Sequence, residues 1–307
     1  MRDFRAQLLW GARYFSDKGT TMSWTLSAFA DEAAPSCEAQ IAALSRAGLK
    51  RLDLRSIEGH NVAALPLDVA REVKQKLDAA QVTVQMLGSP LGKTDIADPF
   101  EAELQKLHHL GEVGPILGCR AVRIFSYYNK NGASHLEWMA KSLSRLETMR
   151  DEAKNLDLVL FHENERHIFG DLGADVMQIA ALRDANFKLI FDFDNFNQSG
   201  EDVWATWQML ADVTDAFHLK DSTADNQHVP VGQGNGRVRD IIADAVARGW
   251  SGPVAVEPHL SHSGAVAATG PSGLANASFA SMPPAESFHL ALEAAKALLD
   301  DVGAPWN

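Results

Sequence analysis

Four polar side chains end four successive apolar runs, and their types are those of metal ligands. The run that starts at Leu158 leads into Glu163, and the next three runs lead into Asp192, His218 and Glu257. Each run is short and is followed by a helical pattern, which predicts strands buried on both faces. The intervals of 29, 26 and 39 positions are close to one strand-helix-strand unit, roughly 30 residues. We therefore expect the four side chains on one rim of a parallel sheet.

Such a set favours a divalent cation, because three carboxylates and one imidazole suit ions of this class. Mn²⁺ is the expected ion, with Mg²⁺, Co²⁺ or Zn²⁺ as alternatives. Asp194 competes with Asp192 as a ligand, and Asp192 is preferred because it ends the apolar run. The structural alternative is that Glu163 and Glu257 are solvated strand ends and that His218 is an ordinary buried histidine. The occurrence of all four in series favours the metal site.

The rest of the chain alternates strand and helix patterns. Strands are expected at residues 24–30, 50–54, 82–87, 121–125, 158–164, 187–191, 216–217 and 253–256, and helices at about 36–47, 66–80, 99–117, 136–155, 174–183, 202–211, 237–248 and 286–299. Eight alternations without a break in composition predict an α/β chain forming a single (β/α)8 TIM barrel. In such barrels the active site lies at the carboxyl ends of the strands, which is where the four polar residues are expected.

Two segments fall outside this alternation. Residues 1–21 show no clear period and are predicted to be an N-terminal extension of a barrel domain that covers 22–307. The stretch 261–284, after the eighth strand, is rich in Gly, Ala and Ser and is about twice the usual length of a connection. A lid over the rim and an insertion without function are the alternatives for this long loop.

Composition limits the partners and the compartment. The 307-residue chain has a net charge of −12, which argues against nucleic acid because phosphate backbones are bound mainly by Lys and Arg. Cys37 and Cys119 cannot form a disulfide framework, so a cytoplasmic location is expected. No apolar run approaches the roughly 20 residues of a membrane span, and the first residues lack a secretory signal. The oligomeric state stays open, a homo-oligomer included.

Short motifs at these strand ends resemble those of the xylose-isomerase-like TIM-barrel superfamily, the sugar phosphate isomerase/epimerase family. They are Glu163-Asn164, Phe191-Asp192 with Asn195-Phe196, Phe217-His218-Leu219-Lys220-Asp221 with Pro230-Val231-Gly232-Gln233-Gly234, and Val256-Glu257-Pro258. The resemblance covers roughly residues 24–299. It implies that Glu163, Asp192, His218 and Glu257 bind the metal ion and that the two glutamates form the acid/base pair.

Departures from the family pattern bear on the reaction. Members that resemble ketose 3-epimerases carry His where this chain has Asn195 and Arg where it has Ala224, which argues against a plain 3-epimerase. The endonuclease branch needs further histidines, including an Asp-x-His that Asn226-Gln227-His228 does not supply. Because the superfamily also contains lyases, the fold does not fix the reaction.

The expected chemistry is proton transfer at a small hydroxy-ketone, a sugar or polyol derivative. A divalent ion chelating its adjacent oxygens acidifies the C–H between them and stabilises an enediolate. Glu163 and Glu257 would remove and return the proton, giving an isomerase or epimerase. If the neighbouring carbon bears a leaving group, the same site would act as a lyase, a dehydratase or β-eliminase of a keto-sugar or keto-cyclitol. A barrel that only binds a ligand is the third alternative.

Candidate substrate contacts are Lys220, Asn195, His162, Arg123 and Arg55. Lys220 follows His218 by two positions and should face the same side, where it would contact a substrate oxygen or form a salt bridge to Asp221 or another rim carboxylate. Arg55 and Arg123 lie at or near strand ends, and an ion pair inside the barrel is the alternative for Arg123. His162 should face the opposite side from Glu163, so packing is its alternative.

Two motifs are set aside. In His162-Glu163-Asn164-Glu165-Arg166-His167 the histidines are five positions apart on a predicted strand, whereas the zinc-protease motif needs one helical face. Gly232-Gln233-Gly234-Asn235-Gly236 lacks the full dinucleotide fingerprint and does not open a βα turn. No nicotinamide cofactor is expected.

Overall fold

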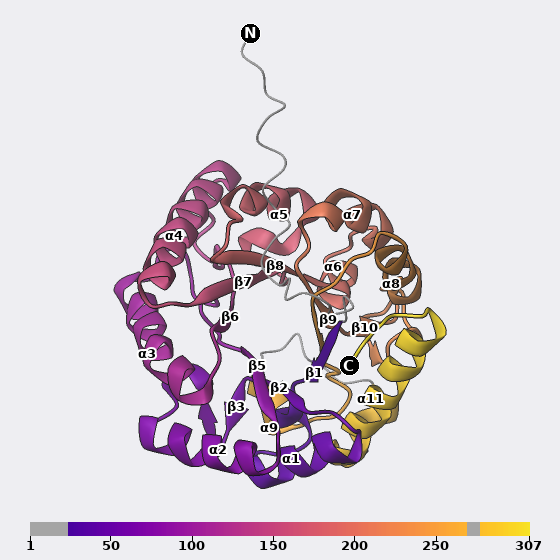
Figure 1. The fold of residues 1–307 in the computed structure, drawn as a ribbon. Coiled ribbons are helices and arrows are strands. Elements are labelled where there is room, and N and C mark those ends of the chain that lie inside the picture. Colours follow the sequence, from indigo (N-terminus) through magenta and orange to yellow (C-terminus); the bar gives the residue numbers. More distant parts are fainter. Residues whose placement is uncertain (1–23, 269–276) are drawn as a thin grey trace.

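The computed structural model describes residues 24–268 and 277–307, and it shows eight parallel strands closed into a barrel inside a ring of helices (Figure 1). In barrel order the strands are β1 (Thr25–Ala28), β12 (Pro253–Val256), β9 (Ala216–Leu219), β8 (Phe187–Asp192), β7 (Val159–Glu163), β6 (Ala121–Ile124), β5 (Thr83–Leu87) and β2 (Arg51–Leu54). The predicted single (β/α)8 barrel is confirmed. The predicted N-terminal extension, 1–21, lies outside the described residues.

The helices of the described residues agree with most of the predicted ranges to within a few positions. They are α1 (Cys37–Arg46), α2 (Leu67–Ala79), α3 (Glu101–Leu117), α4 (His135–Asn155), α5 (Gly173–Ile179), α6 (Phe193–Gln198), α7 (Val203–Leu210), α8 (Val238–Ala247), α9 (Gly264–Ala268), α10 (Ala277–Ala280) and α11 (Pro284–Asp301). The α4 helix starts where it does because Ser134 and Glu137 form a capping box, which satisfies two backbone N–H groups at once. None of the described helices is long and apolar enough to cross a membrane.

Several smaller elements were not predicted as separate elements, because they are too short to show a period. They are the hairpins β3 (Ser56–Ile57) with β4 (His60–Asn61) and β10 (Asp221–Ser222) with β11 (His228–Val229), the helices α6, α9 and α10, and the 3₁₀ turns η1 (Ala30–Glu32), η2 (Val62–Ala64), η3 (Phe169–Asp171), η4 (Ala180–Leu182) and η5 (Ala211–Val213). The helix α9 lies in the long loop after β12 and contacts η1, with Leu260 and Val266 buried. The first part of that loop therefore packs against the rim.

Alternation along β9 shows how packing sets the direction of a site residue. Phe217 points outward into an aromatic cluster, with ring centroids 4.4 Å from Trp250 and 5.4 Å from Phe193. Successive side chains of a strand point to opposite faces, so His218 must point into the barrel. Truncating a buried Phe to Ala lowers the free energy of unfolding by about 3–5 kcal/mol, so the outward packing of Phe217 firmly fixes this orientation of the strand.

The barrel interior below the rim is filled rather than open. Ile190 and Ala216 pack there with Met86, against Ala121 and Phe161. Four of these side chains lie two positions before Asp192, His218, Arg123 and Glu163, and they form the apolar layer beneath the rim, as expected for a barrel whose centre is a packed core. Polar groups gathered at the rim are therefore separated from the opposite face of the barrel.

Candidate metal centre

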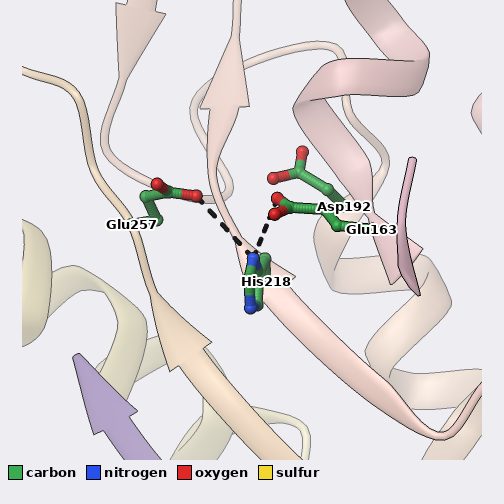
Figure 2. Close-up of side chains that lie close together, drawn as sticks. All are labelled: Glu163, Asp192, His218 and Glu257. Carbon is green, nitrogen blue, oxygen red and sulfur yellow. Dashed lines mark hydrogen bonds and ion pairs between the residues drawn. The ribbon is translucent and has the colours of Figure 1, made fainter. Parts of the chain in front are cut away.

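The carboxyl ends of four neighbouring strands bring the predicted tetrad together. Glu163 ends β7, Asp192 ends β8, His218 lies in β9 and Glu257 directly follows β12. One ligand atom from each lies within 4.8 Å of all the others, and each residue is at most 3% exposed. Figure 2 shows Glu257 on one side, Glu163 and Asp192 on the other, and His218 between and beneath them.

The imidazole of His218 presents Nδ1 to the carboxylates. Nδ1 lies 2.9 Å from Glu163 Oε1 and 3.7 Å from Glu257 Oε2. Nε2 is buried without a hydrogen-bond partner. Nδ1 is therefore the ring atom that faces a cation at this site.

The tetrad fits one divalent ion. Two oxygen ligands of the same ion, at about 2.0–2.6 Å from it, lie no more than about 5 Å apart, which the 4.8 Å limit satisfies. Glu163 Oε2 and Asp192 Oδ2 are buried and accept no hydrogen bond, and each faces a basic side chain, Arg123 at 3.1 Å and Lys220 at 3.2 Å. A cation at the site would take the place of these ion pairs. Three carboxylates and one imidazole suit Mn²⁺, Mg²⁺, Co²⁺ or Zn²⁺.

Three basic side chains contact the tetrad, and all three were predicted as candidate substrate contacts. Arg123 Nη1 lies 3.1 Å from Glu163 Oε2 and 3.4 Å from Glu257 Oε1. Arg55 Nη1 lies 2.7 Å from Glu257 Oε1. Lys220 Nζ lies 3.2 Å from Asp192 Oδ2 and 3.9 Å from Glu257 Oε2. Lys220 faces the same side as His218, as predicted, and its ion pair is with Asp192 rather than with Asp221.

Burial opposes ionisation of the three carboxyl groups, and the neighbouring cations decide the outcome for each. For Glu163, His218 and Arg123 outweigh burial and lower its pKa to about 2. For Glu257, Lys220 and Arg123 outweigh burial and hold its pKa well below the usual range. For Asp192, burial outweighs Lys220 and raises its pKa well above the usual range. Asp192 therefore gives up its proton less readily than the two glutamates do.

The family model described as xylose isomerase-like TIM barrel matches residues 41–278. The chain belongs to this family. No curated protein matches it in sequence. The resemblance inferred from the strand-end motifs is thereby confirmed.

Solved structures share the barrel of this xylose isomerase-like chain at low sequence identity. An IOLI protein with a bound zinc atom superposes with a TM-score of 0.71 at 13% identity, over 91% of this chain and 99% of that one. A D-allulose 3-epimerase from Methylomonas sp. superposes with a TM-score of 0.67 at 17% identity, over 91% of this chain and 99% of that one. A probable 3-DHS dehydratase, AsbF from Bacillus anthracis, superposes with a TM-score of 0.66 at 14% identity, over 90% of this chain and 99% of that one. At these identities the likeness shows the fold.

The side chains of the other two candidate contacts, Asn195 and His162, bond to groups outside the tetrad. Asn195 donates its backbone N–H to Asp192 Oδ1 at 2.8 Å and its side-chain amide to the carbonyl of Asn164 at 2.9 Å. It thereby holds Asp192 in place as the cap of α6. His162 faces away from Glu163, and its Nε2 lies 2.8 Å from Ser126 Oγ, which agrees with the packing alternative.

Asp194, the alternative ligand candidate to Asp192, contacts other side chains. Its Oδ2 lies 3.1 Å from His228 Nε2 and accepts a hydrogen bond of 2.5 Å from Gln198. Asp194 does not belong to the group of four ligand atoms. The structure therefore favours Asp192, as the end of the apolar run indicated.

A second group of ligand-type residues adjoins the first and was not predicted. Glu32, Glu257 and His259 also place one ligand atom each within 4.8 Å of one another. However, Arg55 Nη1 lies 2.7 Å from Glu257 Oε1 and 3.5 Å from His259 Nε2, and Nη2 lies 3.3 Å from Glu32 Oε1. The guanidinium already supplies the cation of this group. The sequence signal that could have identified His259 is its position two residues after Glu257, because side chains two positions apart along extended backbone face the same side.

Phe29 packs against two of the basic side chains, Arg55 and Arg123. Its fully buried ring lies 5.1 Å from the guanidinium carbon of Arg55 and 4.9 Å from that of Arg123, within the range of cation–π attraction. The edge-to-face contact with His218 has a centroid distance of 5.3 Å. A Cβ on Gly88 would come within 2.7 Å of the Phe29 ring, so this position requires glycine.

The glycine-rich segment after β9 is explained by one carboxylate. Asp221 accepts backbone N–H groups from Gly232 at 2.9 Å, Gly234 at 3.0 Å and Gly236 at 2.9 Å. A Cβ on Gly234 would overlap Asp221 Oδ1. The spacing of these glycines therefore serves a loop that wraps an internal carboxylate.

Proposed function

We propose that this protein is a divalent-metal-dependent isomerase or epimerase of a small hydroxy-ketone, a sugar or polyol derivative. The observation that carries the proposal is the position of Glu163 and Glu257 on opposite sides of a buried four-residue ligand set (Figure 2). Mn²⁺ is the proposed ion. When bound, a divalent ion supplies a Lewis acid that acidifies a C–H beside the substrate carbonyl.

The two glutamates would carry the proton. Low pKa values keep Glu163 and Glu257 ionised at neutral pH, so either carboxylate can accept a proton from a bound substrate. Because they flank the site, one would remove a proton and the other would deliver one to a different carbon or face. Arg123 contacts both carboxylates and would keep them oriented while protons move.

A lyase acting through the same site is the second candidate, and Glu32 favours it. Burial raises the pKa of Glu32 to about 8, with Glu257 and Asp31 adding to the rise against Arg55. A protonated carboxyl group therefore lies beside Glu257 at neutral pH. Such a group would protonate a departing hydroxyl or aglycone, which is the role of a general acid in elimination.

Deuterium exchange separates the candidates. The Mn²⁺-loaded protein would be incubated in D₂O with ketoses, inososes and 3-keto-glycosides. Deuterium uptake without loss of water or aglycone supports the isomerase or epimerase, and loss of either supports the lyase. Absence of both across the panel, with metal bound, would contradict the proposal and leave a ligand-binding barrel. Glu72→Gln, an exposed position on α2, is the matched control for Glu257→Gln.

A further inference from the structure

The buried basic side chains at the barrel mouth are all paired with carboxylates of the protein. Arg55, Arg123 and Lys220 are the buried Lys and Arg residues of the described chain. They lie 2.8 Å from Asp31 Oδ2, 3.1 Å from Glu163 Oε2 and 3.2 Å from Asp192 Oδ2, respectively. Lys93, half-buried nearby, lies 2.7 Å from Glu165 Oε2. A bound anion would have to compete with these carboxylates for each cation.

Carboxyl groups outnumber basic side chains at the mouth. Eight carboxyl groups interact with the three buried bases: Asp31, Glu32, Asp53, Glu163, Glu165, Asp192, Asp194 and Glu257. Lys93 is the fourth basic side chain there, and a divalent ion would add two positive charges. A phosphate group, which carries about −1.5 to −2 at neutral pH, would add negative charge to a mouth whose carboxyl groups already outnumber its basic side chains.

The backbone amides that serve phosphate in other barrels are also occupied. Phosphate sites of TIM barrels are frequently formed by the loops after the seventh and eighth strands, here β9 and β12. After β9, Asp221 accepts the amides of Gly232, Gly234 and Gly236. After β12, Pro258 has no N–H, and the amide of His259 donates to Glu32 Oε2 at 2.8 Å. In both loops the protein's own carboxylates take the place that phosphate oxygens would fill.

We propose that the site takes uncharged, unphosphorylated hydroxy-ketones and rejects their phosphate esters. This inference rests on the proposed function, because it names the substrate class of the same site. Arg55, Arg123 and Lys220 then neutralise the carboxylates around the metal centre, and their remaining N–H groups donate to hydroxyl or carbonyl oxygens. Like charges brought together in a buried site cost several kcal/mol, so the discrimination should be large.

The first test compares matched pairs on the Mn²⁺-loaded full chain. D-ribulose with D-ribulose 5-phosphate and D-fructose with D-fructose 6-phosphate would be compared by kcat/KM for deuterium uptake in D₂O. We expect the free ketose to exceed its ester by at least about 100-fold in any pair that exchanges. An ester that exchanges as fast as its free ketose, or faster, overturns the inference while leaving the proposed function intact.

The second test does not need turnover. Inorganic phosphate would be titrated calorimetrically into the metal-free protein and into Lys220→Met and Arg55→Met. We expect binding at the mouth to be weaker than about 1 mM. If phosphate binds the wild type more tightly than this and the variants lose that binding, the inference is overturned. If both variants retain the tighter binding, phosphate binds outside the mouth, and the exclusion of phosphate from the mouth stands. If no ketose exchanges and phosphate does not bind, the proposed function fails and the exclusion of phosphate stands.

Discussion

His218 Nδ1 lies 2.9 Å from Glu163 Oε1, while Nε2 of the same ring is buried without a hydrogen-bond partner. The imidazole therefore turns Nδ1 toward the three carboxylates, and in the proposed metal site Nδ1 would be its ligand atom. A neutral imidazole carries one proton, and metal binding through Nδ1 requires that proton on Nε2.

Replacement of His218 should weaken metal binding. His218→Ala removes one of four ligands, and we expect Mn²⁺ affinity to fall by more than about 100-fold, because loss of a mere supporting contact already costs about 10–100-fold. Calorimetric titration of the metal-free protein measures this. His262→Ala, at an exposed position, is the control. Unchanged affinity in His218→Ala would refute its assignment as a ligand.

Replacement of Glu257 should separate metal binding from turnover. Glu257→Gln keeps an oxygen donor and the volume of the side chain but cannot act as a base, so we expect kcat to fall by about 10²–10⁴. Mn²⁺ binding should weaken only in part. Steady-state kinetics with parallel metal titration measures both, and full activity in the variant would remove Glu257 as an acid/base group.

Replacement of Arg123 should shift the pH dependence of turnover. Burial raises the pKa of Glu163 and Glu257, and Arg123 is one of the cations that outweigh it. Without this cation both pKa values rise, so the acidic limb of the kcat/KM profile should move to higher pH in Arg123→Met. Arg123→Lys keeps the charge and should move it less. An acidic limb at the wild-type position in Arg123→Met would contradict the role assigned to this contact.

The parts of the site that the sequence predicts are those fixed by strand periodicity. Glu163 and Asp192 end buried strands, and His218 lies in one, with Phe217 beside it packed outward. Since alternation has a period of two, the inward side of Lys220 follows from that of His218. These positions depend on local pattern, and the sequence specifies them without knowledge of tertiary contacts.

The parts that the sequence does not predict depend on contacts between distant segments. Arg55 joins Asp31 after β1 to Glu257 after β12, a relationship that no local pattern records. Asn195 was placed by analogy as a substrate contact, but in the structure its amide bonds to Asn164 across two strand ends. The short helix α6, which sets that direction, has six residues and too few turns to show a period.

Metal binding should release a proton. The pKa of Asp192 is raised well above its usual range, chiefly by burial, so we expect its carboxyl group to carry a proton in the metal-free protein. Coordination requires the carboxylate, and we expect about one proton to leave per ion bound near neutral pH. Calorimetry in buffers of different ionisation enthalpy counts it. Asp192→Asn should release none, and a wild-type value near zero would show that Asp192 is already ionised.

His162 should make the fold sensitive to acid. Burial lowers its pKa to about 3, whereas an unfolded histidine titrates near 6.5. Below pH 6.5 the unfolded chain binds a proton that the folded chain excludes, so stability that is complete above pH 6.5 is lost as the pH falls toward 3. This group contributes a loss of up to about 1.4 kcal/mol per pH unit.

The variant His162→Gln removes this titration but weakens the contact with Ser126 Oγ, which lies 2.8 Å from His162 Nε2. At pH 7 we expect the variant to be less stable than the wild type by about 1–3 kcal/mol. At pH 5 the difference should shrink by about 2 kcal/mol, because only the wild type loses stability through this group. Urea unfolding at both pH values measures the difference, with His262→Gln as the exposed control. The imidazole of His162, which lies in β7, is packed tightly against Gly170, where an added Cβ would come within 2.7 Å of it. An equal difference in stability at pH 7 and pH 5 would mean that His162 accepts a proton in the folded state, and it would contradict this prediction.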